Sequence, residues 1–281
     1  MNFRNSSIIK LRRFKRNISN KKNIWSDYSK HFNYVSEYYP AKNIMKAPIV
    51  QKTMFDKNAR LQKIKSKKLL HTIIDISNEI ESSFFISKTK IKAWLSIFGS
   101  IIEECDVLEP DFEKFLKSRY LIEFGPGLGF NAEIYSRTYK TKAIFFDLSE
   151  ITDLRSIVFE EFKKASKNQI LLKPEEYTEI NSIFKRVSKL KEYSFFSSWA
   201  FTESPLNIRN QFFDIIDKSI MTIIVSNPKF ENIDNFEYLS NLALKLNNHQ
   251  HVYSNLGFLE KVPKYLQKHH LHLFINKNYK K

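Results

Sequence analysis

Three of the five glycines of this 281-residue chain fall between residues 125 and 129, as Gly125, Gly127 and Gly129. Glycine adopts positive φ angles at little steric cost and lets other atoms come close to the main chain. In a chain this poor in glycine, their spacing predicts a sharply bent loop that approaches a ligand. Glu123 stands just before the loop, and Asp147 follows it after a further helical and strand-like stretch. Carboxylates at these places can bind a cationic amino group and the two hydroxyls of a ribose, which predicts a site for a nucleoside cofactor.

The residues that flank the glycines place the loop between a strand and a helix. The run 119–122 is apolar and of strand type, 130–135 has helical character, and 143–146 is a second strand-like run that ends at Asp147. This succession is that of a β-turn-α-β unit with an acid at the tip of its second strand. Taken alone, Asp147 is equally a helix N-cap or a solvated strand end, so the prediction depends on its pairing with the glycines.

The order of the small residues separates two classes of cofactor. A dinucleotide site requires Gly-x-Gly-x-x-Gly/Ala, and Phe130 is too bulky for the last of these positions. The observed order is acid-x-Gly-x-Gly-x-Gly. A carboxylate at Glu123 would repel a pyrophosphate but suits the amino group of a methionine moiety. The pattern resembles motif I of the class I S-adenosylmethionine methyltransferases.

The charge of the chain favours an anionic partner. The formal net charge is +16, and neither 1–22 nor 261–281 contains an acid. This asymmetry suits nucleic acid, an anionic membrane face, or acidic glycans and nucleotide-linked sugars. A solvated, lysine-rich surface accounts for the same charge. The charge therefore indicates the sign of a partner and not its identity.

Cysteine content and hydropathy indicate the compartment. Cys105 is the one cysteine, so no internal disulfide forms, and its place in a helical apolar stripe predicts a core residue. No apolar run is long enough to span a membrane, and the N-terminus has no uninterrupted apolar signal segment. We expect a cytoplasmic protein, with peripheral contact at the inner membrane face as a further interpretation of its basic N-terminus. The sequence does not indicate an oligomeric state.

The pattern of elements divides the chain into three regions: a basic tail at 1–22, a mainly helical, substrate-covering region at 23–110, and a cofactor-binding domain at 111–281. In the last region strand and helix signals alternate, which predicts an α/β fold with a doubly wound parallel sheet of Rossmann-like type. The strands are expected at 120–124, 143–147, 170–173, 194–200 and 221–226, with helices at 157–164, 180–190 and 206–216. Two further strand-like runs, 249–253 and 271–275, would complete the seven-stranded sheet of a methyltransferase, whose last strand is antiparallel.

Ligands of such sheets bind beyond the carboxyl ends of the strands. Glu175 or Glu176, after the third expected strand, is a candidate for contact with the adenine, and a solvated turn acid is the alternative. Ser198 and Trp199 end the fourth strand and are candidates for contact with the cofactor. A tryptophan at such a place is also commonly a core residue.

Glu203 is the candidate catalytic residue. It lies between the fourth strand and a helix that Ser204, followed by proline, is expected to cap. There it would act as a general base toward a substrate hydroxyl, or be an acid that the helix dipole stabilises. His249 and His251 are weaker candidates for the base. The histidines at 269, 270 and 272 alternate across a strand, so we expect no metal site.

Four segments together resemble the sugar O-methyltransferases of bacterial surface-glycan loci. They are Glu-Phe-Gly-Pro-Gly-Leu-Gly at 123–129, Phe-Asp-Leu-Ser-Glu at 146–150, Trp-Ala-Phe-Thr-Glu-Ser-Pro at 199–205 and Glu-Asn-Ile-Asp-Asn at 231–235. The resemblance covers residues 119–276 and departs at 202–204, where Thr-Glu-Ser replaces the family's Ser-Glu-Met. It implies transfer of a methyl group from S-adenosylmethionine to a sugar hydroxyl, in a glycan or its nucleotide-linked precursor.

Two other functions use the same features. An RNA or DNA methyltransferase would share the fold and the charge, and Asn227-Pro-Lys-Phe is similar to the Asn/Asp-Pro-Pro-Tyr/Phe signature of amino-methylating enzymes. That signature follows the fourth strand, however, whereas Asn227 follows the fifth. A non-catalytic polyanion-binding protein on a methyltransferase fold is the second alternative. The intact glycines and acids of the cofactor motif argue against it.

Overall fold

The computed structural model describes residues 24–54, 59–117, 119–165, 172–259 and 266–279, so the basic tail expected at 1–22 lies outside the described residues. The helices are α2 Ile24–Tyr38, α3 Pro48–Thr53, α4 Lys67–Ser83, α5 Lys88–Leu108, α6 Phe112–Leu116, α7 Phe130–Tyr139, α8 Ser149–Ala165, α9 Ile180–Val187, α10 Leu206–Gln211, α11 Phe213–Lys218 and α12 Asn235–Lys245. The short 3₁₀ segments are η2 Ala41–Lys46, η3 Ala200–Glu203, η4 Leu256–Phe258, η5 Leu266–Lys268 and η6 Lys277–Tyr279. The strands are β1 Tyr120–Phe124, β2 Lys142–Phe146, β3 Glu175–Tyr177, β4 Tyr193–Ser198, β5 Met221–Ser226, β6 Lys229–Phe230, β7 Ile233–Asp234, β8 His249–Asn255 and β9 His270–Asn276.

The main sheet has seven strands in the order β3-β2-β1-β4-β5-β9-β8. The first five of these pair in parallel, and β9 is antiparallel to both of its neighbours. The order reverses between β1 and β4, so the sheet is doubly wound and its topological switch point lies at their carboxyl ends. The predicted fold class, a Rossmann-like seven-stranded sheet with its last strand antiparallel, is confirmed.

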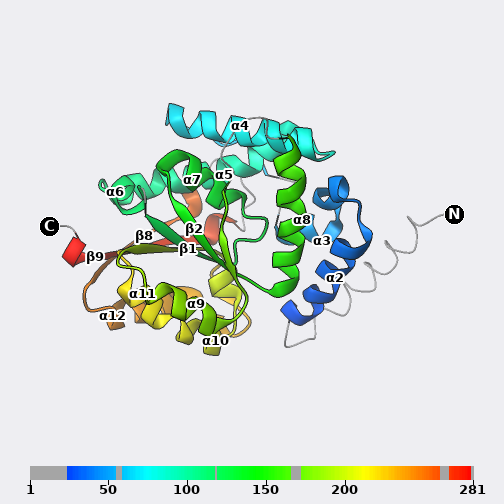
Figure 1. The fold of residues 1–281 in the computed structure, drawn as a ribbon. Coiled ribbons are helices and arrows are strands. Elements are labelled where there is room, and N and C mark those ends of the chain that lie inside the picture. The colour runs from blue at the N-terminus through cyan, green and yellow to red at the C-terminus, as the bar shows by residue number, and fades with distance from the viewer. Residues whose placement is uncertain (1–23, 55–58, 118, 166–171, 260–265, 280–281) are drawn as a thin grey trace.

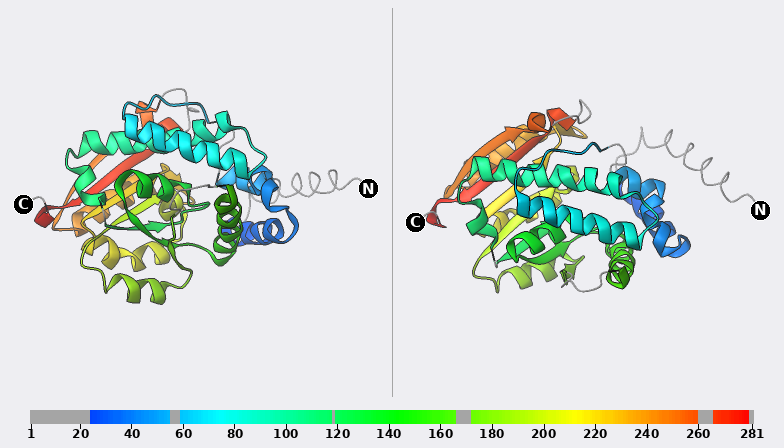
Figure 2. Two further views of the ribbon diagram at one scale, coloured as in Figure 1. Left: turned by 45° about the horizontal axis from the view of Figure 1, so that its top comes forward. Right: turned by 90° about the horizontal axis from the view of Figure 1, so that it is seen from above.

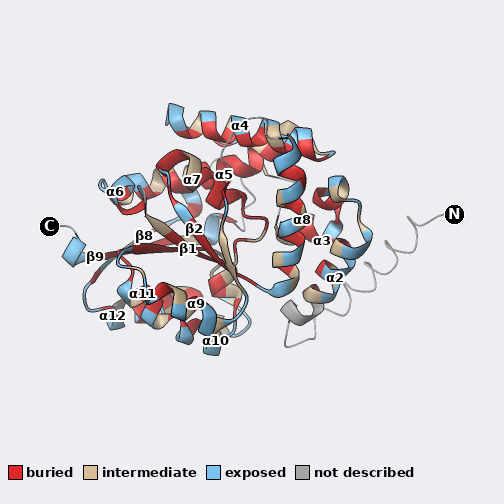
Figure 3. Cartoon of the chain, viewed as in Figure 1, coloured by how far each residue is buried: buried red, intermediate tan, exposed pale blue. Residues whose placement is uncertain are grey.

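Helices pack on both faces of this sheet (Figures 1 and 2). The buried apolar residues of the described ranges form two large clusters and a small one. Successive strand residues point to opposite faces, so Leu121 joins the core under α5–α7 while Ile122 joins the core under α9–α12. Helix α4 lies outside α5 and α7 as an additional layer. The strands and the inner sides of the helices are buried, and the outer helix faces are exposed (Figure 3).

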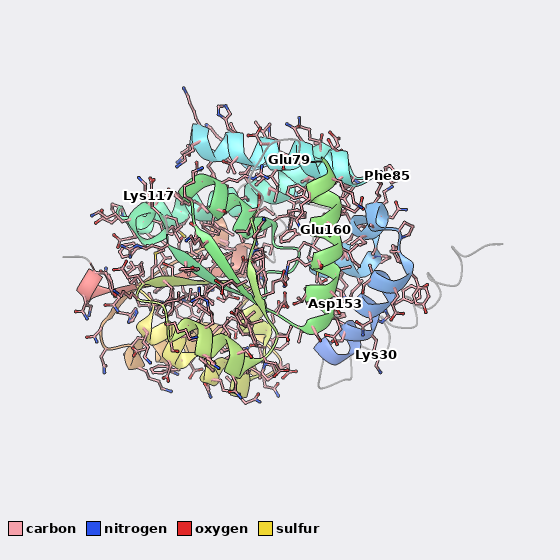
Figure 4. The ribbon with its side chains drawn as sticks, in the orientation of Figure 1. Lys30, Glu79, Phe85, Lys117, Asp153 and Glu160 are labelled. Carbon is pink, nitrogen blue, oxygen red and sulfur yellow. The ribbon has the colours of Figure 1, made fainter. Side chains whose placement is uncertain are left out.

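The helical region before the sheet shares one core with it. Phe32 of α2 and Ile44 of η2 belong to the same buried cluster as Leu121 of β1. Helix α8 stands beside the sheet with α2 and η2 packed against it (Figure 1). It exposes Asp153 and Glu160 to solvent (Figure 4). None of the described helices is long and apolar enough to cross a lipid bilayer.

Two local predictions were wrong. The third strand is Glu175–Tyr177 and not 170–173, because the apolar Leu172 is buried in a small cluster with Phe145 instead of pairing in the sheet. Residues 166–171 lie outside the described residues. Ser204 does not cap α10, because its hydroxyl donates to the carbonyl of Phe201 and the helix starts one residue later than expected.

Candidate active site at the switch point

The glycine loop, residues 125–129, connects β1 to α7 at the switch point. All three of its glycines have positive φ, at 67° for Gly125, 57° for Gly127 and 78° for Gly129. The close approach that the sequence predicted is made at Gly125 by the chain itself, because a Cβ there would lie 2.1 Å from the Cβ of Ala200 in η3. Met54, after α3, lies beside Gly127. The helical region therefore reaches the loop.

Glu123, the penultimate residue of β1, carries a buried carboxyl group. Its side chain is 1% exposed, and neither carboxyl oxygen forms a hydrogen bond of ordinary geometry with the residues that the structure describes. Burial raises the pKa of Glu123 to about 8, while the charge of Arg155 and the nearby amide of Asn131 lower it. A buried carboxyl without partners is rare, because desolvation of a polar group costs free energy that only a hydrogen bond or opposite charge recovers. The group is therefore poised to pair with a cation.

Asp147 follows β2 directly and points to the glycine loop. Its Oδ2 accepts from the N–H of Gly127 at 3.2 Å, and its Oδ1 accepts from the N–H of Leu148 at 2.9 Å. Its third partner, Arg155, was not predicted from the sequence; the guanidinium donates to Oδ2 at 3.0 Å. Burial raises the pKa of Asp147, and Arg155 opposes that rise.

Arg155 is fully buried on the inner side of α8 and links three elements of the site. Besides Asp147, it donates to the carbonyl of Gly127 at 2.6 Å and to Glu176 of β3 at 2.9 Å. The signal that could have revealed it is an arginine within the apolar stripe of α8, next to Leu154. A charge at such a place is unfavourable unless it is paired.

Glu175, the candidate for the adenine, is not brought to the glycine loop. It accepts two hydrogen bonds from Arg186 of α9, at 2.5 and 2.8 Å, and one from Tyr177. Adjacent residues of a strand point to opposite faces, so its neighbour Glu176 is the one that reaches Arg155 and the loop.

Ser198 and Trp199 lie at the carboxyl end of β4, next to the switch point. Ser198 is half-buried and pairs in register with Val225 of β5. Trp199 has φ of 66°, and its indole N–H donates to Nδ1 of His269 at 2.7 Å. Positive φ is strongly disfavoured for a bulky residue and commonly marks functional sites. The ring also packs edge-on against Phe98 of α5, with centroids 6.3 Å apart.

Glu203 ends η3 and lies beside a polar cluster that the sequence analysis did not assemble. The side-chain amide of Asn227, after β5, donates to its Oε1 at 3.3 Å. Burial raises the pKa of Glu203 to about 7, while the charge of Arg209 lowers it. A carboxyl with such a pKa is suited to take up a proton near neutral pH.

The histidines of β8 and β9 are engaged elsewhere. His249 lies within hydrogen-bond distance of the carbonyl of Ser219. Ser219 precedes β5 and so lies at the amino ends of the parallel strands, whereas Glu203 lies beyond their carboxyl ends. His251 and His272 share a hydrogen bond at 3.0 Å. Within the described ranges, no group of three or more potential metal ligands is arranged to hold an ion.

Comparison with known proteins finds similarity only among solved structures. No protein-family model and no curated protein matches the chain. The methyltransferase domain of bacterial CtHen1 is 10% identical with a TM-score of 0.47, over 63% of this chain and 98% of that one. MtNAS in complex with MTA and tNA is 10% identical with a TM-score of 0.43, over 91% and 99%. TrmK of M. capricolum, in complex with S-adenosylhomocysteine, is 14% identical with a TM-score of 0.38, over 59% and 66%. These similarities are low, and the strand order of the sheet defines the fold without them.

Proposed function

We propose that the chain is an S-adenosylmethionine-dependent methyltransferase that methylates a sugar hydroxyl of a bacterial surface glycan or its nucleotide-linked precursor. The observation that supports the cofactor is the carboxyl of Glu123, which forms no hydrogen bond of ordinary geometry with the described residues and is buried beside a positive-φ glycine loop at the switch point of the sheet. A ligand that brings a primary ammonium group into this place would supply the missing partner. S-adenosylmethionine carries such a group, and when bound it supplies an electrophilic methyl group.

The other residues of the site fit the nucleoside part of this cofactor in a specific way. Oδ2 of Asp147 already accepts from Gly127 and Arg155, whereas Oδ1 accepts, among the described residues, only from the N–H of Leu148. A carboxylate oxygen has two lone pairs, so Oδ1 is the atom that would accept from the ribose hydroxyls. Arg155 would hold Asp147 in place, and Trp199 would bound the site from β4. Ser198, beside Trp199, would line the same wall.

Glu203 supports the proposal that a hydroxyl oxygen of the substrate accepts the methyl group. Alkylation of a hydroxyl requires a base to take its proton as the new bond forms, and a carboxyl with a pKa of about 7 serves this role at neutral pH. The signature of amino-methylating enzymes follows the fourth strand. Here Trp199 and Ala200 follow β4, and the similar Asn227 segment follows β5. The net charge of +16 suits an anionic sugar or a nucleotide-linked one, and also a peripheral contact with an anionic membrane face.

Two observations favour other functions. The same net charge suits an RNA or DNA methyltransferase. The contacts of Ala200 and Arg155 with the glycine loop suit a non-catalytic polyanion-binding protein, because the chain itself fills part of the space around the loop.

Calorimetry with S-adenosylmethionine and S-adenosylhomocysteine distinguishes a methyltransferase from a non-catalytic polyanion-binding protein. We expect the parent protein to bind both compounds and E123Q to bind each at least tenfold more weakly. E175Q is the matched control, because Glu175 pairs with Arg186 outside the loop, and its affinity should match the parent's. Absence of binding by the folded parent protein would refute both enzymatic functions.

Incorporation of labelled methyl groups identifies the acceptor. Nucleotide sugars, extracted surface glycan and total RNA are offered in parallel, and we expect label in a sugar fraction. E203Q should lower kcat at least tenfold while the dissociation constant of the cofactor stays unchanged. If only RNA were labelled, the substrate would be a nucleic acid and the proposed sugar substrate would be wrong.

A further inference from the structure

Arg209 of α10 is a buried cation without a carboxylate partner in the part of the chain that the structure describes. It is 1% exposed, and its three donor groups reach the carbonyl of Ser204 at 2.7 Å, the carbonyl of Thr202 and Oδ1 of Asn235 at 2.7 Å. Its guanidinium lies 5.1 Å from the ring centroid of Tyr238. Burying a charge on neutral acceptors alone is costly, and an apolar side chain would pack at less expense. The carbonyls of Thr202 and Ser204 belong to the residues on either side of Glu203, so Arg209 binds the main chain of the segment that carries the candidate base.

A continuous chain of hydrogen bonds leads from Arg209 to that base. Nδ2 of the fully buried Asn235 donates to Oδ1 of Asn227 at 2.6 Å, and Nδ2 of Asn227 donates to Oε1 of Glu203 at 3.3 Å. Helices α10 and α12, which carry Arg209 and Asn235, lie on the same face of the sheet (Figure 1). We call Arg209, Asn235, Asn227 and Glu203 the relay.

The chemistry of arginine determines the direction of every bond in the relay. A guanidinium only donates, so the atom of Asn235 that faces Arg209 must be its oxygen, and the nitrogen of Asn235 must face Asn227. The atom of Asn227 that receives this donor must likewise be its oxygen. Its nitrogen therefore faces Glu203 and donates, which obliges Oε1 of Glu203 to be an acceptor.

We propose that Arg209 is a positioning residue that, through Asn235 and Asn227, orients the Glu203 carboxylate to take the proton of the substrate hydroxyl. This inference rests on the proposed function. In the step it describes, the hydroxyl oxygen forms its bond to the methyl carbon. The bond between sulfur and that carbon breaks, with its electron pair going to sulfur, and the hydroxyl proton passes to the Glu203 carboxylate.

The charged and titratable groups around the relay act in a consistent direction. Arg209 is the charge that lowers the pKa of Glu203 against the effect of burial. Burial lowers the pKa of Arg209, while Tyr238 of α12, Glu231 between β6 and β7, and Glu203 itself favour its charged form. Loss of the cation or of the Asn227 donor should therefore make the Glu203 carboxylate harder to form.

A carbon-13 NMR titration of the full-length protein, labelled at the glutamate carboxyl carbon, tests the relay without needing a substrate. The Glu203 signal is assigned by its absence in E203Q. We expect a midpoint near 7 in the parent, and an upward shift in both R209Q and N227A. R119Q is the matched control and should leave the midpoint unchanged. Arg119 pairs with Glu192 at the amino ends of β1 and β4, away from Glu203 beyond the carboxyl ends.

Each outcome decides one proposition. An unchanged midpoint in folded R209Q and N227A would overturn the relay. If R209Q does not fold, N227A decides alone, because Asn227 is half-buried and tolerates truncation better. In both variants calorimetry should show parent-like binding of S-adenosylmethionine, while methyl transfer falls at least tenfold and its pH optimum moves upward. A parent that binds no cofactor would defeat the proposed function, whereas unmoved midpoints with cofactor binding intact would defeat only the relay.

Discussion

Replacing Glu123 by glutamine should stabilise the ligand-free protein, even though the residue lies at the centre of the proposed cofactor site. The pKa of Glu123 rises from 4.5 to about 8 on folding, chiefly through burial. A raised folded pKa means that its contribution to stability is fully present below 4.5 and is lost as the pH rises through 8. The rise in pKa from 4.5 to about 8 corresponds to about 5 kcal/mol in the free energy of unfolding. An amide at this place lacks partners as well and costs about 1–3 kcal/mol, which leaves a net gain of about 2–4 kcal/mol for E123Q at pH 9.

Urea unfolding of the ligand-free protein at pH 9 and pH 5 measures this effect, and the gain should shrink at the lower pH. E133Q is the matched control. Glu133 is as buried as Glu123, but it accepts from Arg137 at 2.6 Å and from the N–H of Leu172 at 3.1 Å, so its substitution should lower the free energy of unfolding. If E123Q is destabilised at pH 9 as E133Q is, the Glu123 carboxylate has a partner in the folded protein and the reasoning fails.

Three further substitutions test the packing around the site and the histidines. R155M removes a fully buried cation and leaves its carboxylates uncompensated, which should cost about 3–5 kcal/mol in urea unfolding; adding D147N should recover part of this loss, and a strictly additive double mutant would argue against their pairing. G125A places a Cβ 2.1 Å from that of Ala200 at a φ of 67°, so the melting temperature should fall, with partial rescue by A200G but not by a remote Ala→Gly change. Burial lowers the pKa of His272 from 6.5 to about 3, so its contribution to stability is present above 6.5 and is lost as the pH falls. H272L should make the acid-side decline of the unfolding free energy shallower, and an unchanged decline would contradict this assignment.

Much of the fold could be predicted because its signals are local. Strand β1, strand β5 and the glycine loop were located from short apolar runs and from glycines that only special backbone angles require. Strand β3 was misplaced because it lies at the edge of the parallel part of the sheet. Its polar residues pair there, while the apolar Leu172 is buried next to Phe145. Apolarity reports burial, and at an edge strand burial and pairing need not coincide.

The candidate site shows the same division between local and long-range information. Asp147 could be assigned to the loop because a β-turn-α-β unit brings the two together within one short segment. Arg155 could not, because its place beside Gly127 depends on how α8 turns against the sheet.

The amino-acid sequence predicts the bend of the loop, the acids on either side of it, and the alternation that builds a doubly wound sheet. These are properties of neighbouring residues, since backbone angles and strand periodicity are local. Other properties depend on how distant segments pack: within the described ranges Glu123 forms no hydrogen bond of ordinary geometry, Glu176 and not Glu175 faces the loop, and two asparagines connect Arg209 to Glu203. Partnership and burial are set by segments far apart in the chain, and the chemistry of a carboxyl group depends on both.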